Sequence, residues 1–171
     1  METWDAITSR RNVREFEDRP ISEEDLDRIL EAGRRAPSSR NWQPWDFIVV
    51  TDRAQLGELA GVWRGGGHIA HSAATVVVVL PEFDDADRGQ RAAFDVGQAS
   101  MQMMVAAADL GIGSGHSAVG DQDAARAILG FPQDRAAHIM VDFGYPADRP
   151  LRPIRRPDRR PFEEVVHRGG W

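Results

Sequence analysis

The chain contains no cysteine among its 171 residues. A protein without cysteine cannot form a disulfide, use a thiolate as a nucleophile or hold zinc or an iron–sulfur cluster through sulfur ligands. The composition therefore excludes disulfide-rich folds and cysteine enzymes, and it is compatible with a reducing cytoplasm. We predict no metal site.

Long apolar runs are also lacking. The opening residues METWDAITSRR contain no apolar stretch of the kind found in signal peptides. No run approaches the ~20 apolar residues that a membrane helix requires. We therefore expect a soluble, cytoplasmic protein that does not bind membranes.

Positive charge is in the minority. The formal net charge is -6 at pH 7, whereas nucleic-acid-binding proteins normally carry a basic surplus. We therefore expect no nucleic-acid partner. The arginines are nevertheless gathered in an early and a late group, at Arg10, Arg11 and Arg14 and at Arg152, Arg155, Arg156, Arg159 and Arg160. Two such groups can converge on one anion.

The length and the 42% hydrophobic content predict one domain with a sizeable core, residues 1–171. Residues 74–80 are apolar on both faces, which predicts a central strand. The mixed order of helices and strands favours an α+β sandwich with a mostly antiparallel sheet, or an α/β layered fold. Apolar spacing and capping residues predict helices at 3–11, 22–36, 87–110 and 121–129 and around Leu56 and Leu59, and strands at 45–51, 74–80 and 138–143.

The helix predicted at 87–110 has more apolar surface than one stripe needs. Its stripe consists of Phe94, Gln98, Met101, Val105 and Ala108, and small and soft residues extend beyond it. This pattern indicates burial on several sides, either in the core, which is the simpler reading, or at a dimer interface.

The last part of the chain has a different character. Residues 146–161 are rich in proline and arginine and offer little to bury, which predicts an extended arm. Apolar residues return at 162–171. We expect the far end of the arm, residues 146–171 in all, to dock on a surface that could belong to a second subunit.

Three segments contain residues suited to ligand binding. Residues 9–16 (SRRNVREF) offer guanidinium groups that fork onto phosphate oxygens, and Asn12 adds a neutral hydrogen bond. The alternative is a solvated helix end. Residues 36–45 (APSSRNWQPW) hold hydroxyl and amide groups between prolines, as a planar heterocycle would require. The alternative is a connection whose polar groups cap the backbone.

The third segment is residues 111–120 (GIGSGHSAVG). Its glycines let backbone amides approach a ligand closely and stabilise a developing anion. The segment does not match the dinucleotide-binding fingerprint. His116 is a candidate acid or stacking partner, with a hydrogen-bonded structural histidine as the alternative.

In this order and spacing, the three segments resemble the FMN-dependent nitroreductase family. The resemblance also includes FGYP at 143–146 and RRPFEEVVH at 159–167, and covers nearly the whole chain. It implies an α+β sandwich whose central, mostly antiparallel sheet is flanked by helices. It also implies an intertwined homodimer that exchanges C-terminal arms and holds two FMN sites at its interface.

The resemblance implies a role for each segment in binding FMN. Arg10, Asn12 and Arg159 would hold the phosphate and the ribityl chain, and Arg14 would face the pyrimidine edge and stabilise the reduced, anionic flavin. The loop at 37–43 would come from the partner subunit. The complete set of implied cofactor-binding residues is Arg10, Arg11, Asn12, Arg14, Pro37, Ser38, Ser39, Asn41, Gln43, Ser114, Gly115, His116 and Arg159.

The chain departs from the family pattern in four places. Asn12 replaces a common serine, and His116–Ala118 occupy the place of an acidic residue. The short stretch 81–89 leaves little room for helices over the flavin, which indicates a more open pocket or a different acceptor. His68 lies in the loop where other members place a cation at the flavin edge.

The implied activity needs no side chain as nucleophile, because the flavin carries the chemistry. Hydride from NADH or NADPH would reduce FMN, and a small acceptor such as a nitroaromatic or a quinone would then be reduced. The alternatives are a flavin- or deazaflavin-binding protein with little turnover, and a flavin-dependent dehydrogenase or dehalogenase of a small metabolite. A structural dimer without cofactor is disfavoured by the arginines and the loop at 37–43.

Overall fold

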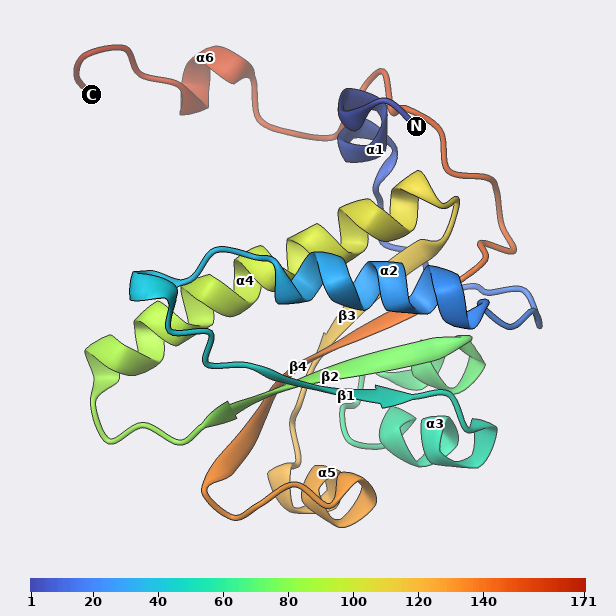
Figure 1. Cartoon of the computed structure of the whole chain (residues 1–171). Helices are drawn as coiled ribbons and strands as arrows, with labels where there is room; N and C mark the ends of the chain where they lie inside the picture. Colours follow the sequence, from blue (N-terminus) through green and yellow to red (C-terminus); the bar gives the residue numbers. More distant parts are fainter.

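An antiparallel sheet forms the centre of the protein (Figure 1). The structure is a computed structural model that describes residues 1–171. Every pair of neighbouring strands is antiparallel, so the predicted α+β class is confirmed and the α/β alternative is wrong. The order across the sheet is β1 (Asp46–Val50), β2 (Ala74–Pro81), β4 (Arg135–Gly144) and β3 (Gly113–Ala118).

Helices cover both faces of the sheet, as Figure 1 shows. On one face lie α2 (Glu23–Arg34) and α4 (Ala86–Asp109), which pack against each other. The other face carries α3 (Arg53–Ala60), η2 (Gly67–His71) and α5 (Gln122–Leu129). Two short elements, α1 (Thr3–Ser9) and η1 (Ser39–Asn41), contact α4.

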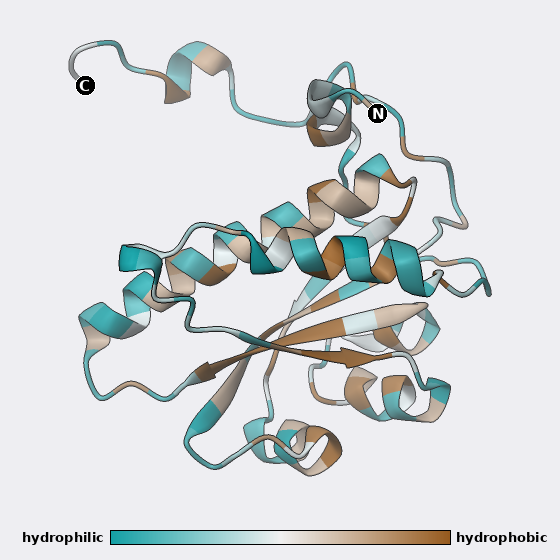
Figure 2. Ribbon diagram, viewed as in Figure 1, coloured by the Kyte–Doolittle hydropathy of each residue, from teal (hydrophilic) through white to brown (hydrophobic).

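The central strand β2 separates two apolar cores. Val76 and Val78 contribute to the core beneath α2 and α4, whereas Val77 and Val79 contribute to the core beneath α3 and α5. Because successive residues of a strand point to opposite faces, a continuous apolar run suits a strand that is covered on both sides. The central position predicted for residues 74–80 is confirmed. Figure 2 shows the hydrophobic colour concentrated on the strands.

Capping side chains fix where the helices begin. The Ser22 hydroxyl accepts a hydrogen bond from the backbone N–H of Asp25, 3.1 Å away, as its place before the helix predicts. Asp85 and Asp121 cap α4 and α5 in the same way. Gly130 ends α5 with φ 72°, in the left-handed region that glycine adopts without strain.

The buried face of α4 differs from the expected stripe. Ala92, Val96 and Met103 are buried against the sheet, whereas Phe94 is 71% exposed and Met101 is 49% exposed. The interpretation of these last two residues as core is therefore wrong for a single chain. None of the helices, α4 included, combines the length and apolar character needed to cross a membrane.

The C-terminal arm follows the N-terminal segment and then leaves the body of the protein (Figure 1). Ala147 N–H donates to the carbonyl of Glu15, and Ile154 N–H donates to the carbonyl of Thr8 at 3.0 Å. Beyond this point only α6 (Phe162–Val165) is regular, and its apolar side chains are exposed. The extended shape agrees with the composition, while docking on a second subunit stays a prediction.

Candidate functional site

The early arginine segment lies along the free edge of β3. Asn12 forms a parallel bridge with Ser114, and Val13 N–H donates to the Ser114 carbonyl at 2.9 Å. Val13 is buried and anchors the segment, while Asn12 and Arg14 are exposed. The segment therefore behaves as an added edge strand that presents polar side chains beside the glycine-rich strand.

Arg10 is a partly buried cation that forms no ion pair and has a second arginine, Arg159, nearby. Arg10 is partly buried and donates to Asn12 Oδ1 at 3.0 Å, but its Nε is buried without a hydrogen-bond partner. Burial, and then the nearby Arg159 cation, lower the pKa of Arg10. Two arginines whose charges repel each other, and neither of which forms an ion pair in this chain, suit an anion with several oxygens.

Arg11 makes different contacts from its neighbour. Its Nη2 donates to Asp148 Oδ1 at 2.6 Å and to the Arg149 carbonyl at 2.8 Å. The Arg11 hydrogen bond is also the main reason that the pKa of Asp148 is lowered. Within this chain Arg11 holds the start of the arm rather than the anion site.

The glycine-rich strand is closely packed on its inner side. Ser114 and Gly115 are buried, whereas His116 is exposed. A Cβ on Gly115 would stand 2.7 Å from Asp142 Oδ2 and 2.9 Å from the carbonyl oxygen of Val13, so no larger residue fits without displacement. The strand and the arginine segment therefore meet backbone to backbone here.

The loop at 37–43 is strained and anchored. Arg40, Asn41 and Gln43 have φ of 53°, 58° and 52°, in the left-handed region that costs about 1–2 kcal/mol for residues with a side chain. Asp95 Oδ2 accepts a hydrogen bond from Ser39 N–H at 3.0 Å. Such strain persists only where surrounding contacts impose it, and it is concentrated at functional sites.

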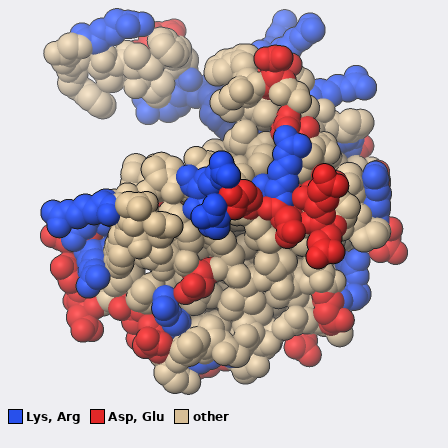
Figure 3. Space-filling model, viewed as in Figure 1, with Lys and Arg blue, Asp and Glu red and all other residues tan.

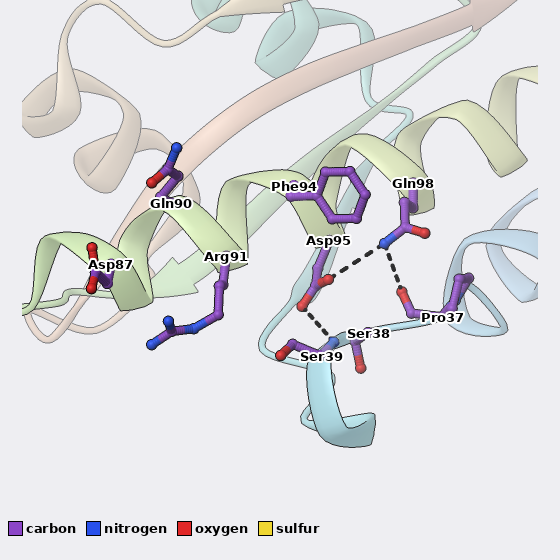
Figure 4. A pocket seen from close by; sticks show the side chains of 9 residues that line it. All are labelled: Pro37, Ser38, Ser39, Asp87, Gln90, Arg91, Phe94, Asp95 and Gln98. Atoms are coloured by element: carbon purple, nitrogen blue, oxygen red, sulfur yellow. Dashed lines mark hydrogen bonds between the residues drawn. The ribbon is translucent and has the colours of Figure 1, made fainter. Parts of the chain in front are cut away.

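A cavity of about 610 Å³ lies between this loop and α4. In Figure 4 the Asp95 carboxylate points to Ser39, and Gln98 lies between Asp95 and the carbonyl of Pro37. The volume of this cavity is within the range of small-molecule sites. The lining residues are Pro37, Ser38, Ser39, Asp87, Gln90, Arg91, Phe94, Asp95 and Gln98.

The two groups of candidate residues lie at different places along α4. The loop is bound at Asp95, whereas Arg10 donates to the sulfur of Met104 at 3.2 Å. Nine helical residues correspond to a rise of about 14 Å. In Figure 1, η1 and α1 accordingly lie toward opposite ends of the helix. One chain does not bring the loop at 37–43 to Arg10.

The His68 side chain points into the interior of the protein. Its side chain is 6% exposed, with Nε2 3.2 Å from Asp142 Oδ1 and 3.4 Å from Ser117 Oγ. The resemblance placed this residue at a position of flavin-edge cations, but the buried ring is not presented to solvent. Asp95 and Asp142 did not stand out in the sequence, because an isolated aspartate in a helix or a strand carries no pattern.

The charged side chains are unevenly distributed. Figure 3 shows arginines along the arm and around α1 and acidic side chains over α2. The acid group on α2 includes Glu31, and hydrogen bonds from Arg34 and Arg35 lower the pKa of Glu31 to about 2.

The chain is similar to known proteins over nearly its whole length. The profile of the nitroreductase family matches residues 7–65 and 55–145. An Archaeoglobus fulgidus protein, provisionally named NADH dehydrogenase/NAD(P)H nitroreductase, is 33% identical over 96% of both chains. A Parabacteroides distasonis structure with the same provisional name has a TM-score of 0.83 and 28% identity, covering 100% of this chain and 99% of that one. An FMN-dependent nitroreductase from Clostridium difficile shares the fold with a TM-score of 0.84 and 23% identity, covering 97% and 98% of the two chains.

Proposed function

Because the chain belongs to the nitroreductase family, we propose that it is a homodimeric, FMN-dependent oxidoreductase. It would take hydride from NADH or NADPH and pass the electrons to a small organic acceptor such as a nitroaromatic or a quinone. The name of the Archaeoglobus relative supports the nicotinamide, and the name of the Clostridium protein supports FMN.

The observation that carries the proposal is the partly buried Arg10 guanidinium, which forms no ion pair and whose pKa is lowered by burial and then by the nearby Arg159 cation. A phosphomonoester carries nearly two negative charges at neutral pH and three acceptor oxygens. Its negative charge would oppose the two causes, burial and then the Arg159 cation, that lower the pKa of Arg10. The donor set therefore fits the phosphate of FMN.

The remaining residues would bind the rest of the cofactor. Asn12 lies beside Arg10 for the ribityl chain, and Arg14 offers an exposed cation that forms no ion pair in this chain and favours negative charge on the reduced flavin. Ser114, Gly115 and His116 lie along the same edge. Bound flavin would supply the hydride chemistry, while these groups hold and polarise it.

A second copy of the chain would complete the site. The partner would contribute its loop, with Pro37, Ser38, Ser39 and Asn41 against the flavin and Gln43 supporting the turn through Ser38 and Asn41. The exposed Phe94 and Met101 would be covered at the interface, and the arm, residues 146–171 of a single flavin-binding domain, would dock on the partner.

An absorption spectrum of the purified protein tests the proposal directly. We expect a yellow protein with a flavin spectrum that bleaches on anaerobic addition of NADH or NADPH and recovers with an acceptor. Bleaching without turnover of any acceptor would indicate a flavin-holding protein. A colourless monomer that does not take up added FMN would contradict the proposal.

A further inference from the structure

Asp142 is a buried acid in the sheet. It lies near the end of β4, is fully buried, and is paired across the sheet with Thr75 of β2 and Gly115 of β3. Its Oδ1 faces His68, while its Oδ2 is buried without a hydrogen-bond partner. Because desolvating a carboxylate is costly, a carboxylate that keeps one oxygen unsatisfied indicates a role beyond packing.

His68 brings one donor to this acid. Its Nε2 lies 3.2 Å from Asp142 Oδ1 and 3.4 Å from the Ser117 hydroxyl. A proton on His68 Nε2 can be donated to either of these two oxygens, Asp142 Oδ1 or Ser117 Oγ. The hydrogen bond therefore fixes the carboxylate in place without covering its second oxygen.

The second oxygen is directed at the glycine-rich strand. Oδ2 stands 2.7 Å from the position of a Cβ on Gly115, and the Val13 carbonyl lies 2.9 Å from the same position. Val13 is followed by Arg14, which is exposed and forms no ion pair. Asp142 therefore lies against the backbone of Gly115 and Val13 from inside the protein, and the exposed Arg14 follows Val13 in the chain.

We propose that Asp142 sets the reduction potential of FMN bound against Ser114 and Gly115. The proposal rests on the proposed function, and it assigns to Asp142 an electrostatic effect without contact with the cofactor. A fixed negative charge in a buried, weakly screened place raises the energy of a nearby anion. Reduction by the nicotinamide adds negative charge to the flavin, so Asp142 lowers its potential and opposes Arg14.

The opposing effects of Asp142 and Arg14 on the reduction potential suit an enzyme that both accepts and donates electrons. Cationic and amide groups alone would stabilise the reduced flavin and hold the electrons there. The Asp142 charge makes the reduced flavin a stronger donor to the acceptor, while Arg14 keeps it reducible by NADH or NADPH.

The test is an anaerobic titration of the FMN-loaded protein against a redox dye, comparing the wild type with Asp142→Asn. The amide keeps the shape of the side chain and an oxygen for His68 but removes the charge. We expect the ratio of reduced to oxidised flavin at a given dye potential to rise about tenfold, which is ~30 mV for a two-electron couple. FMN affinity and the melting temperature are measured on the same samples.

A matched control tests whether the effect is specific to Asp142, and a second variant serves if the first does not fold. Asp134→Asn makes the same change before the other end of β4, about 26 Å along the strand, and is expected to leave the ratio unchanged. If Asp142→Asn does not fold, the apolar pair Asp142→Val with His68→Leu replaces the buried pair, an exchange that proteins often tolerate. This double variant also lacks the Asp142 carboxylate.

A folded, FMN-loaded variant with an unchanged or lower ratio of reduced to oxidised flavin would overturn the assignment. A folded variant that no longer binds FMN would also overturn it, because the residue would then hold the cofactor rather than tune it. Failure of the proposed function is distinguishable, since the wild type itself would then fail to take up FMN.

Discussion

At the scale of single residues, guanidinium groups supply every side-chain cation other than histidine, because the chain contains no lysine. Arginine stays charged in a partly buried place, where lysine readily loses its proton. It also presents a planar fork of donors that matches phosphate oxygens. This difference matters at Arg10, which stays a cation although burial and Arg159 lower its pKa.

Substitutions of Arg10 and Arg14 should affect different properties, FMN binding for Arg10 and flavin reduction for Arg14. Arg10→Ala removes charge-assisted hydrogen bonds to the phosphate and is expected to weaken FMN binding about tenfold to a hundredfold. Arg14→Ala is expected to slow flavin reduction more than it weakens FMN binding. Equilibrium dialysis and stopped-flow bleaching by NADPH or NADH measure the two effects. Full yellow colour after dialysis of Arg10→Ala, or equal losses in both measurements for Arg14→Ala, would contradict these roles.

Gly115 should tolerate no side chain. Gly115→Ala places a Cβ against Asp142 Oδ2 and the Val13 carbonyl, and such overpacking typically costs about 1–3 kcal/mol in the free energy of unfolding. Gly57→Ala is the matched control, because open space surrounds that helical position, and it should stabilise by about 0.5–1 kcal/mol. Chemical denaturation gives both values, and equal stability of the two variants would show that the backbone at Gly115 has room for a side chain.

At the scale of elements, α4 organises the site, since it binds the loop at 37–43 through Asp95 and contacts Arg10 through Met104. The loop is held in an unfavourable backbone conformation by its contacts with α4 and by hydrogen bonds within the loop. Loss of the Asp95 contact should therefore increase the mobility of the loop.

Asp95→Ala should release the loop. The change removes the acceptor of the Ser39 N–H and is expected to cost about 1–3 kcal/mol where the donor is left unsatisfied. Hydrogen–deuterium exchange at residues 38–43 should accelerate, and FMN binding should weaken if the partner's loop contacts the flavin. Asp95→Asn keeps an acceptor oxygen and should show a smaller change. Unaltered exchange in Asp95→Ala would mean that other contacts hold the turn.

The regular elements were largely predictable, because their signals are local. Ser22 capped a helix as predicted, and the apolar run at 74–80 formed the central strand. The strand at 113–118 was not predicted, since glycine and serine have low strand propensity and only pairing with β4 makes the segment extended. The burial of His68 and the left-handed loop also depend on distant partners. The sequence was sufficient to identify the three implied cofactor segments. It could not show that the loop at 37–43 and Arg10 contact α4 at separate places.

At the scale of the whole molecule, apolar surface remains uncovered on α1, α4 and the arm. Trp4 and Phe94 are more than two-thirds exposed, and Trp171 is fully exposed. Apolar side chains left in water over several neighbouring elements mark a surface for association. A two-fold arrangement would cover this surface and bring each loop to the arginines of the other chain.

Met101→Glu should separate the subunits. It places a charge on the exposed face of α4, where desolvation at an interface would be costly. Sedimentation should show a shift from dimer to monomer together with loss of FMN. Val49→Glu alters a similarly exposed apolar residue on β1 and should leave both properties intact. A dimeric, yellow Met101→Glu protein would place the interface elsewhere.

The separation of the loop from Arg10 along α4 makes cofactor retention depend on the amount of protein. If neither chain alone can enclose the flavin, dilution below the dimer dissociation constant should release it, and FMN added in excess should draw monomers together. A cell that makes little of this chain would then hold it mainly without cofactor. The activity per molecule would rise with expression instead of staying constant.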